Sequence, residues 1–315
     1  MYLKLIFLLM MISVLLNADI YTRTKVEMGT FITISLDEKY KEYIEDGFEI
    51  LSDLNLALSS YNKNATIYKL NHQREIKIDS YTYQALNLSR YYYERTRGYF
   101  DISIGSITKD LYRFGQVQRV PSKKEKEDAK VNFNGIHFDR FKASLENGVK
   151  VDLGGMGKGF GVDKVASYYI NRDIKKGIIA ASGDIRCLST CSIDVQDPFS
   201  DKTLASFRTK KNNSSISTSG NYNRYVDSLK HNHLINPKTK ESQNRFISIT
   251  LISSLTNSDI DAYATASSVM PLKQAYKFLD SLKLAYIVLQ SDGELVISKN
   301  IYKYSDDLLV NYTKK

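Results

Sequence analysis

The pattern of apolar and polar side chains near the start of the chain predicts a strand followed by a helix. Apolar and polar residues alternate along residues 30–36, as they do in a half-buried strand. From residue 44 to residue 58 the apolar positions recur at helical spacing and form one face, made of Ile44, Phe48, Leu51, Leu54 and Leu58. A second helix is expected from Ser80 to Arg97, where Gly98 ends it.

The middle of the chain carries weaker patterns. Residues 115–150 form a polar, lysine-rich connection, with weak strands expected at Ile136–Phe138 and Val149–Leu153. A helix is expected from about Gly161 to Asn171, directly after a run of glycines. The connection therefore separates the first strand and helices from a strand-rich second half.

The second half is made of short, β-prone segments and two helices. The expected strands are Gly177–Ala181, Ile193–Val195, Leu204–Phe207, Ser214–Thr218 and Phe246–Ile252. Helices near Asp259–Met270 and Leu272–Leu282 come before a final hairpin of Tyr286–Leu289 and Glu294–Ile297. Because strands and helices follow one another without a βαβ rhythm, the sequence predicts an α+β fold with mixed or antiparallel sheets and packed helices.

The first 18 residues differ from the rest. Lys4 precedes an apolar run from Leu5 to Leu16, and the small residue Ala18 follows, which is the layout of a secretory signal peptide. We expect residues 1–18 to be removed and residues 19–315 to form one domain in the periplasm. No later segment approaches the length of a membrane span, so no stable span is expected after cleavage. An uncleaved inner-membrane anchor facing the periplasm is the alternative.

Charge and cysteine content narrow the range of partners. The 315 residues carry a formal net charge of +9, which can indicate nucleic acid, an anionic membrane or an anionic small ligand. The basic residues are scattered, and the dense stretch Lys123–Lys130 alternates with acidic residues as on a solvated helix face. Export argues against a nucleic-acid partner. Cys187 and Cys191 lack a redox or zinc pattern but could pair in an oxidising compartment.

The most informative motif is the glycine-rich run VDLGGMGKGFGVDK at residues 151–164. Asp152 leads into a turn with several glycines and Lys158, and backbone without side chains can approach an anionic group such as a phosphate. The run fits neither the GxGxxG dinucleotide pattern nor the P-loop. Tight packing of a helix on a strand would also explain the glycines, but it would not explain the lysine among them.

Two polar clusters follow in the second half. Thr218, Ser219 and Gly220, with Arg224 nearby, offer hydroxyls, a flexible glycine and a guanidinium that suit a phosphate, although alone they would make an ordinary polar turn. His233 lies before a proline-terminated segment and would be polar surface in most proteins. Beside a bound phosphate it could take a proton from an attacking hydroxyl, because the pKa of histidine lies near working pH.

The last cluster lies in the expected helix near Asp259–Met270. Asp261 and Thr265 are four positions apart and share a helical face, so a carboxylate and a hydroxyl point the same way. Mg²⁺ prefers such oxygen ligands, completed by water and phosphate. Asp259 is expected to cap the helix, which leaves Asp261 without a structural role.

The order of the motifs along the chain resembles that of the FAD:protein FMN transferases, the flavin-transferase (ApbE) family. The resemblance extends from Met28 to about Met270. Each motif is weak alone, and their shared order is specific. They are Met28-Gly29-Thr30, Ser60-Tyr61, Leu70-Asn71, Gly98-Tyr99-Phe100-Asp101 with Gly105, Asp152-Leu153-Gly154-Gly155 with Lys158-Gly159 and Asp163, Ser182-Gly183-Asp184-Ile185, Asp197-Pro198, Thr218-Ser219-Gly220 with Tyr222 and Arg224-Tyr225, His233-Leu234-Ile235-Asn236-Pro237, and Asp261 with Thr265. Three positions depart from the family pattern: Ser182 and Lys240 replace glycines, and Asn236 replaces an aspartate.

The resemblance implies a role for each matching residue. Asp261, Thr265 and a backbone carbonyl near Gly155 are expected to hold Mg²⁺. His233 and Asp261 are the candidate catalytic residues. The expected FAD contacts are Met28, Tyr61, Tyr99, Phe100, Asp101, Asp152, Lys158 and His233, to which the polar cluster adds Thr218, Ser219 and Gly220.

The implied reaction is Mg²⁺-dependent transfer of FMN from FAD to a threonine or serine hydroxyl of an exported or membrane-bound flavoprotein, with release of AMP. One alternative is a flavin-binding carrier without transferase activity, which would need the glycine run but neither the metal ligands nor His233. Another is a pyrophosphatase that uses the same site and water to give FMN and AMP from FAD.

Overall fold

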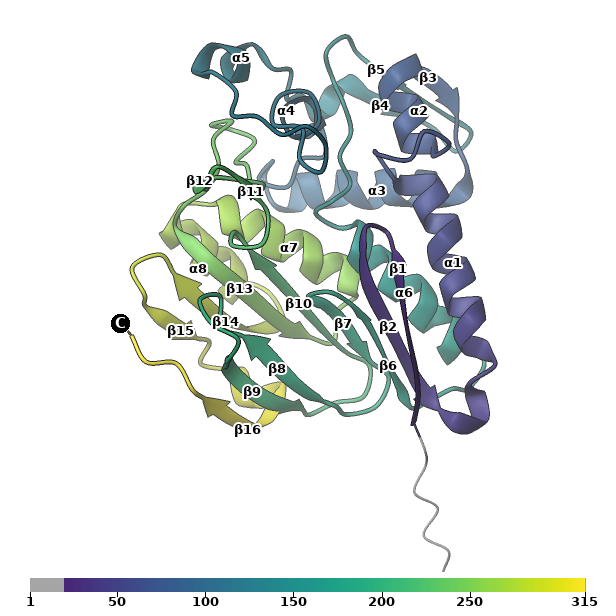
Figure 1. The fold of residues 1–315 in the computed structure, drawn as a ribbon, viewed down its shortest axis with the longest axis vertical. Helices are drawn as coiled ribbons and strands as arrows, with labels where there is room; N and C mark the ends of the chain where they lie inside the picture. The colour runs from purple at the N-terminus through teal and green to yellow at the C-terminus, as the bar shows by residue number, and fades with distance from the viewer. Residues whose placement is uncertain (1–19, 315) are drawn as a thin grey trace, which may run out of the picture.

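The centre of the fold is an eight-stranded sheet with the order β1-β2-β6-β7-β10-β13-β14-β15, and Figure 1 shows it as the broad layer at the centre of the molecule. The structure is a computed structural model that describes residues 20–314, so the predicted signal peptide lies outside the described residues. Every neighbouring pair of strands in this sheet is antiparallel. The bounds are β1 Ile20–Glu27, β2 Thr30–Asp37, β6 Gly177–Ala181, β7 Asp184–Cys187, β10 Ser214–Gly220, β13 Phe246–Ser253, β14 Leu284–Gln290 and β15 Leu295–Ile297.

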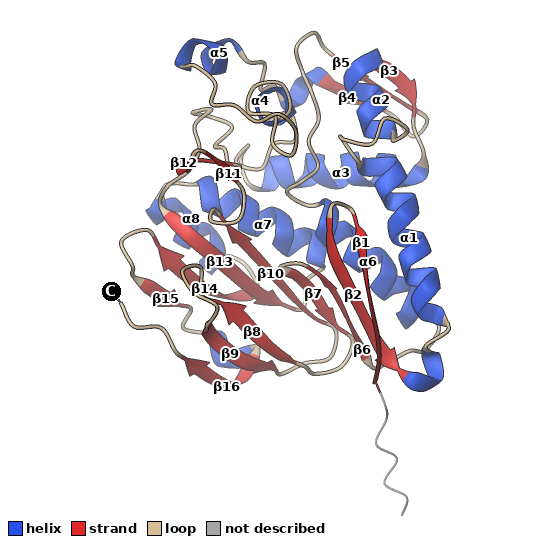
Figure 2. Cartoon of the chain, viewed as in Figure 1, coloured by secondary structure: helices blue, strands red, loops and turns tan. Residues whose placement is uncertain are grey.

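Four helices cover one face of this sheet (Figure 2). They are α1 Tyr43–Leu58, α6 Gly157–Ile170, α7 Asn257–Val269 and α8 Leu272–Asp280. Both faces of the large sheet are covered at strand β14, because every residue of this strand is buried. Leu284, Tyr286 and Val288 pack among the helices, while the residues between them point to the opposite side.

A three-stranded sheet, with the order β16-β9-β8, covers part of the opposite face. Its strands are β8 Ser192–Gln196, β9 Thr203–Thr209 and β16 Ser305–Val310. Ile193, Val195 and Phe207 from this sheet pack against Ala285 and Ile287 of β14 in one apolar cluster. The two sheets therefore share a core.

The remaining elements form a smaller lobe beside the helices, in the upper part of Figure 1. They are α2 Thr66–Gln73, β3 Glu75–Lys77, α3 Ser80–Arg95, α4 Gly105–Thr108, α5 Lys123–Asp128, β4 Ile136–Phe138, β5 Lys142–Leu145, β11 Tyr225–Val226 and β12 Ser228–Asn232. Short 3₁₀ turns lie at Glu38–Tyr40, Phe133–Gly135 and Ile301–Lys303. The predicted α+β class is confirmed.

Three local predictions are wrong, each for a physical reason. Residues 149–153 form only one isolated bridge, between Lys150 and Ile104, and no strand, because the Asn71 amide side chain binds both the N–H and the C=O of Val151 at 2.7 and 2.8 Å. Helix α6 begins at Gly157 and not near Gly161. Helix α7 is capped by Thr256, and Asp259 is the capping-box partner whose carboxylate accepts from the Thr256 amide.

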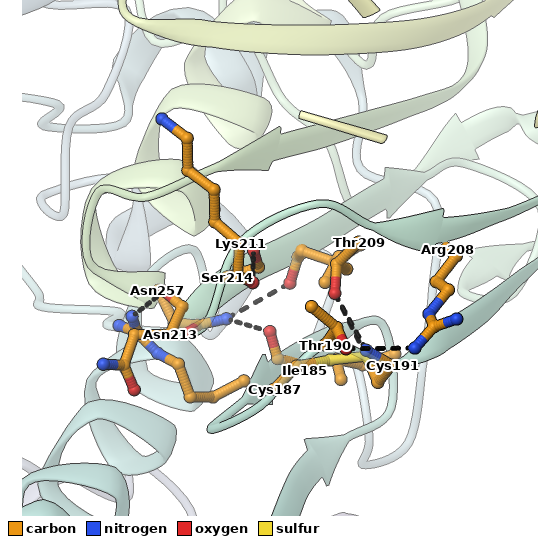
Figure 3. The surroundings of a disulfide bond; sticks show 12 residues. Ile185, Cys187, Thr190, Cys191, Arg208, Thr209, Lys211, Asn213, Ser214 and Asn257 are labelled. Carbon is orange, nitrogen blue, oxygen red and sulfur yellow. Dashed lines mark hydrogen bonds between the residues drawn. A yellow bond between two sulfur atoms is a disulfide. The ribbon is translucent and has the colours of Figure 1, made fainter. Parts of the chain in front are cut away.

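Cys187 and Cys191, whose pairing the sequence left open, form a disulfide (Figure 3). Cys187 ends β7 and Cys191 comes just before β8. The Thr209 hydroxyl accepts a hydrogen bond from the Cys191 amide at 2.9 Å. The disulfide thus joins the large sheet to the small one at the point where the chain crosses between them.

Candidate active site

One cleft of about 1280 Å³ lies where the loops after α1 and α3 meet the start of α6, the end of β10 and the inner face of α7. Every candidate site residue from the sequence lines this cleft. They are Met28, Tyr61, Tyr99, Phe100, Asp101, Asp152, Gly155, Lys158, Thr218, Ser219, Gly220, His233, Asp261 and Thr265. Their individual roles stay predictions, but residues from distant parts of the chain meet in one place.

The glycine run is part turn and part helix. The turn ends at Met156, and Gly157 and Gly159 belong to the first turn of α6. A Cβ atom on Gly159 would lie 2.4 Å from the Asn257 carbonyl oxygen, so this glycine lets α6 pack directly against α7. The packing explanation therefore holds for Gly159, while Gly155 and Lys158 line the cleft.

Lys158 lies between two buried carboxylates. Its Nζ is 2.8 Å from Asp184 Oδ2 and 3.6 Å from Asp261 Oδ2. Burial alone would lower the pKa of Lys158, but the two carboxylates outweigh it and hold that pKa above its usual value. Burial and the nearby Asp184 charge raise the pKa of Asp261 to about 7. When Asp261 is ionised, two carboxylates and one ammonium leave this acidic cluster with a negative charge.

The groups expected to hold magnesium are Asp261 of the acidic cluster, Thr265 and the Gly155 carbonyl. The Thr265 hydroxyl is 3.2 Å from the Gly155 carbonyl oxygen, and Asp261 lies one helical turn before Thr265 on α7. A carboxylate, a hydroxyl and a carbonyl oxygen are the ligand types that Mg²⁺ prefers, so the residues present fit this ion. Within residues 20–314, no three His, Cys, Asp or Glu side chains group closely enough to hold a metal by themselves.

A second charged cluster lies at the other end of the glycine run. Lys109 Nζ is 3.1 Å from Asp152 Oδ2 and 2.6 Å from the Tyr61 hydroxyl, and it also lies 3.9 Å above the Tyr61 ring. The Arg224 guanidinium donates to the same Tyr61 hydroxyl. The Thr108 hydroxyl donates to Asp152 at 2.6 Å. This basic cluster has one carboxylate and two cations, so it carries a positive charge.

The basic cluster keeps its carboxylate ionised. Burial alone would raise the pKa of Asp152, but the Lys109 ammonium, the Thr108 hydroxyl and the Arg224 charge lower it to about 2. Lys109 was not among the residues picked out from the sequence. A lone lysine in a loop carries no motif, and only the fold shows that its side chain is 8% exposed and lies against Asp152.

His233 lies in the cleft wall beside Arg224, and its ring is partly buried. Its Nδ1 is 3.0 Å from the Arg224 carbonyl oxygen, so a proton on Nδ1 leaves Nε2 as the acceptor. Burial, followed by the positive charge of Arg224, lowers the pKa of His233 to about 4. The expectation of a pKa near working pH is therefore wrong for the free protein, in which His233 is neutral at pH 7.

The remaining wall of the cleft combines aromatic and polar groups. Met28 lies at the tip of the β1–β2 hairpin in the left-handed conformation. The Tyr99 hydroxyl donates to Gln274 at 3.1 Å, and Lys238 lies 4.2 Å above the Tyr99 ring. Burial raises the pKa of the neighbouring Asp101 carboxyl to about 6. This wall offers apolar and aromatic surface of the kind that contacts planar rings.

The strand predicted to end at Thr218 continues to Gly220 as β10, so the polar cluster at residues 218–220 is not a turn. Thr218 shares a hydroxyl–hydroxyl hydrogen bond of 2.9 Å with Thr250 on the neighbouring strand. Gly220 leaves room for the Tyr222 ring, which would lie 2.3 Å from a Cβ atom at that position. These residues line the cleft as part of a rigid sheet and not as a flexible turn.

The family model described as the ApbE family matches residues 28–288. The chain belongs to the ApbE family. This confirms the family indicated by the order of the motifs, and because the ApbE family is a family of enzymes, it confirms that the chain is an enzyme.

Curated ApbE relatives match over most of their own length. The FAD:protein FMN transferase of Haemophilus influenzae is 27% identical over 292 residues, which cover 82% of this chain and 81% of the relative. That of Klebsiella pneumoniae is 23% identical over 246 residues, covering 74% and 78%.

Solved ApbE structures share the fold of this chain. A crystal structure of the ApbE protein from Thermotoga maritima superposes with a TM-score of 0.84 at 23% identity, covering 92% of this chain and all of that one (100%). The flavin transferase ApbE from Vibrio cholerae gives 0.78 at 19% identity, covering 91% and 99%.

The structure shows the surroundings of the three residues that were expected to depart from the family pattern. Ser182 and Lys240 both adopt the left-handed backbone conformation that favours glycine, with φ of 56° and 59°. The Lys240 ammonium donates to the carbonyl oxygen of Ala129 at 2.9 Å. The Asn236 amide donates to the Val269 carbonyl at 2.8 Å, which an ionised aspartate could not do.

The structure contains no helix, within residues 20–314, that is long and apolar enough to cross a membrane.

Proposed function

We propose that this chain transfers FMN from FAD to a threonine or serine hydroxyl of another exported protein, in a Mg²⁺-dependent reaction that releases AMP. The observation that carries the proposal is the pairing of an acidic cluster at Asp261 with a basic cluster at Asp152 and Lys109 in one cleft. The name shared by the curated relatives supports the same reaction. We place the reaction in the periplasm on the signal-peptide pattern of residues 1–18.

The two clusters would bind groups of opposite charge. Lys109 and Arg224 present cations to an anionic part of FAD, while the aromatic wall at Tyr99 and Phe100 offers surface for a ring system. Mg²⁺ held by Asp261, Thr265 and the Gly155 carbonyl would neutralise negative charge on the pyrophosphate. Lys158 lies close to Asp261 in the free protein and would contact a phosphate once the cation is bound.

The transfer step forms one P–O bond and breaks another. The acceptor hydroxyl oxygen attacks the phosphorus on the FMN side of the pyrophosphate, and the bond from that phosphorus to the bridging oxygen breaks. AMP leaves with the bridging oxygen, and the acceptor keeps FMN through a phosphoester. His233 Nε2 takes the proton of the hydroxyl. The negative charge of bound FAD would raise the pKa of His233 from about 4 and make it a better base.

The test is to incubate the purified chain with FAD, Mg²⁺ and a threonine-containing acceptor. In-gel flavin fluorescence on the acceptor, together with release of one AMP per FMN transferred, is the expected result. Free FMN and AMP without a labelled acceptor would identify a pyrophosphatase instead. Bound, unchanged FAD would identify a carrier. Addition of EDTA should abolish labelling, and labelling that persists in EDTA would contradict the metal assignment.

A further inference from the structure

Strand β8 has one edge without a backbone partner among residues 20–314. It is the last strand of the small sheet, in which β9 lies between β16 and β8. The ladder joins β8 to β9 from Ser192 opposite Arg208 to Gln196 opposite Thr203. An unpaired strand edge presents a row of amides and carbonyls that can pair with another extended chain.

The hydrogen-bond pattern shows which backbone groups lie on that edge. At one end the Thr209 amide donates to the Cys191 carbonyl at 2.8 Å, and at the other the Asp197 amide donates to the Lys202 carbonyl at 2.9 Å. In an antiparallel pair, every second residue turns its N–H and C=O toward the partner. The odd-numbered residues of β8 therefore face β9. The N–H and C=O groups that point away belong to Ser192, Asp194 and Gln196.

The unpaired edge opens into the cleft that holds the charged clusters. Residues 193–196 line that cleft, as do Ile185 of β7 and Thr218 of β10. The side chains of Ile193 and Val195 point toward the large sheet, where they join the core between the two sheets. A strand added along β8 would alternate in the same way. Every second side chain of that strand would therefore point toward the large sheet and into the cleft.

The edge is held in place before any partner arrives. The disulfide between Cys187 and Cys191 ties the start of β8 to the end of β7 (Figure 3). The side chains of Ile193 and Val195 hold β8 in place by packing in the core between the two sheets. A preformed edge loses less conformational freedom when a partner binds, which favours association.

We propose that the unpaired edge of β8 docks the acceptor polypeptide as an added strand, with the reactive threonine or serine on the side that faces the large sheet. The proposal rests on the proposed FMN transfer, which requires a polypeptide hydroxyl to reach this cleft. A row of alternating amides and carbonyls matches an extended peptide and not a flavin nucleotide. Because pairing uses the backbone of the partner, the edge would accept segments that differ in sequence around the hydroxyl.

The test compares Asp194→Pro with Asp194→Ala. Proline removes an outward N–H that β9 does not use, a position where an edge strand tolerates it, and alanine keeps that N–H while removing the side chain. The probe is a pool of peptides of about ten residues with a fixed central threonine. Asp194→Pro should raise the KM for the best-labelled peptide about 3- to 10-fold, the loss expected for one backbone hydrogen bond. Asp194→Ala should change it less than about twofold.

The FAD affinity and melting temperature of both variants show whether the fold and the nucleotide site are intact. A second measurement does not depend on a variant. Hydrogen exchange at the amides of Ser192, Asp194 and Gln196 should slow when the best-labelled peptide of the pool is added to the wild-type chain. An unchanged KM in Asp194→Pro, or unchanged exchange at these amides, would overturn the docking while leaving FMN transfer in place. A wild-type chain that binds FAD but labels no peptide would overturn the transfer itself, and the docking with it.

Discussion

The two lysines in the cleft, Lys158 and Lys109, lie in opposite electrostatic surroundings. Lys158 stands between Asp184 and Asp261, so its cluster has an excess of negative charge when Asp261 is ionised. Lys109 is paired with Asp152 and shares the Tyr61 hydroxyl with a second cation, Arg224, so its cluster keeps an excess of positive charge. Residues 152–158 of the glycine run connect the two.

The difference shows which end of the cleft suits which ligand. An excess carboxylate in a buried site favours a divalent cation, whereas an excess cation favours a phosphate. A nucleotide that carries Mg²⁺ on its pyrophosphate needs both at a short distance from each other. Variants that remove a charge from one end of the cleft at a time test this difference.

The largest effect is expected at the acidic end. Asp261→Asn keeps an acceptor for the Gly159 amide but removes the charge that would hold Mg²⁺, so the rate of FMN transfer should fall about a hundredfold or more. The measurement is acceptor labelling at saturating FAD over a range of Mg²⁺ concentrations. Asp259→Asn, in the first turn of the same helix, is the matched control and should stay within about threefold of the wild-type rate. Transfer at full rate in Asp261→Asn would show that the acidic cluster is not the metal site.

The low pKa of His233, in the cleft wall beside Arg224, predicts a dependence of stability on pH. Its pKa is about 4 in the folded protein and about 6.5 in the unfolded chain, so the unfolded chain takes up its proton first as the pH falls. The stabilisation due to neutral His233 is therefore present above pH 6.5 and is lost between pH 6.5 and 4. Wild type should lose about 1–2 kcal/mol more than His233→Asn in unfolding free energy from pH 7 to pH 5.

Urea unfolding at the two pH values measures this difference. His137→Asn, at an exposed histidine, is the control and should lose as much stability between the two pH values as wild type. Equal losses in wild type and His233→Asn would mean that the ring is not held neutral by the cleft.

A smaller effect is expected at the basic end. Lys109→Met leaves Asp152 buried without its main cationic partner and should weaken FAD binding about tenfold. Titration of flavin fluorescence gives the Kd. Lys150→Met removes the ion pair with Asp110 outside the cleft and should leave the Kd unchanged. If the two variants weakened FAD binding equally, the cause would be the lower net charge of the protein. The loss of a cation from the basic cluster would then not be the cause.

The smallest effect is expected for the phenol that links the two cations. Tyr61→Phe keeps the ring under Lys109 but removes the hydroxyl shared by Lys109 and Arg224, so FAD binding should weaken about threefold. The same fluorescence titration checks it. A loss as large as that of Lys109→Met would indicate that the phenol, and not the ammonium, is the main FAD contact at this end.

Sequence patterns predicted most of the strands of the large sheet and its long helices, because a half-buried strand and an amphipathic helix each have a periodicity of their own. Strand β6 and the helix α8 start where the pattern placed them. Edge strand β1 was missed, because both of its faces are mostly exposed and carry no clean alternation. Residues 149–153 were taken for a strand because the sequence does not show that Asn71, about eighty positions earlier, binds their backbone.

The sequence by itself determined the family and the residue types of the candidate site, since those follow from motifs that are local in the chain. Asp261 and Thr265 share a face because helical spacing requires it. Only the tertiary structure decided that Lys109 lies against Asp152, that Asp184 joins Asp261 on Lys158, and that the edge of β8 opens into the same cleft. Charge balance, the pKa of His233 and an unpaired edge depend on which distant segments meet, and packing brings them together through contacts that no local pattern records.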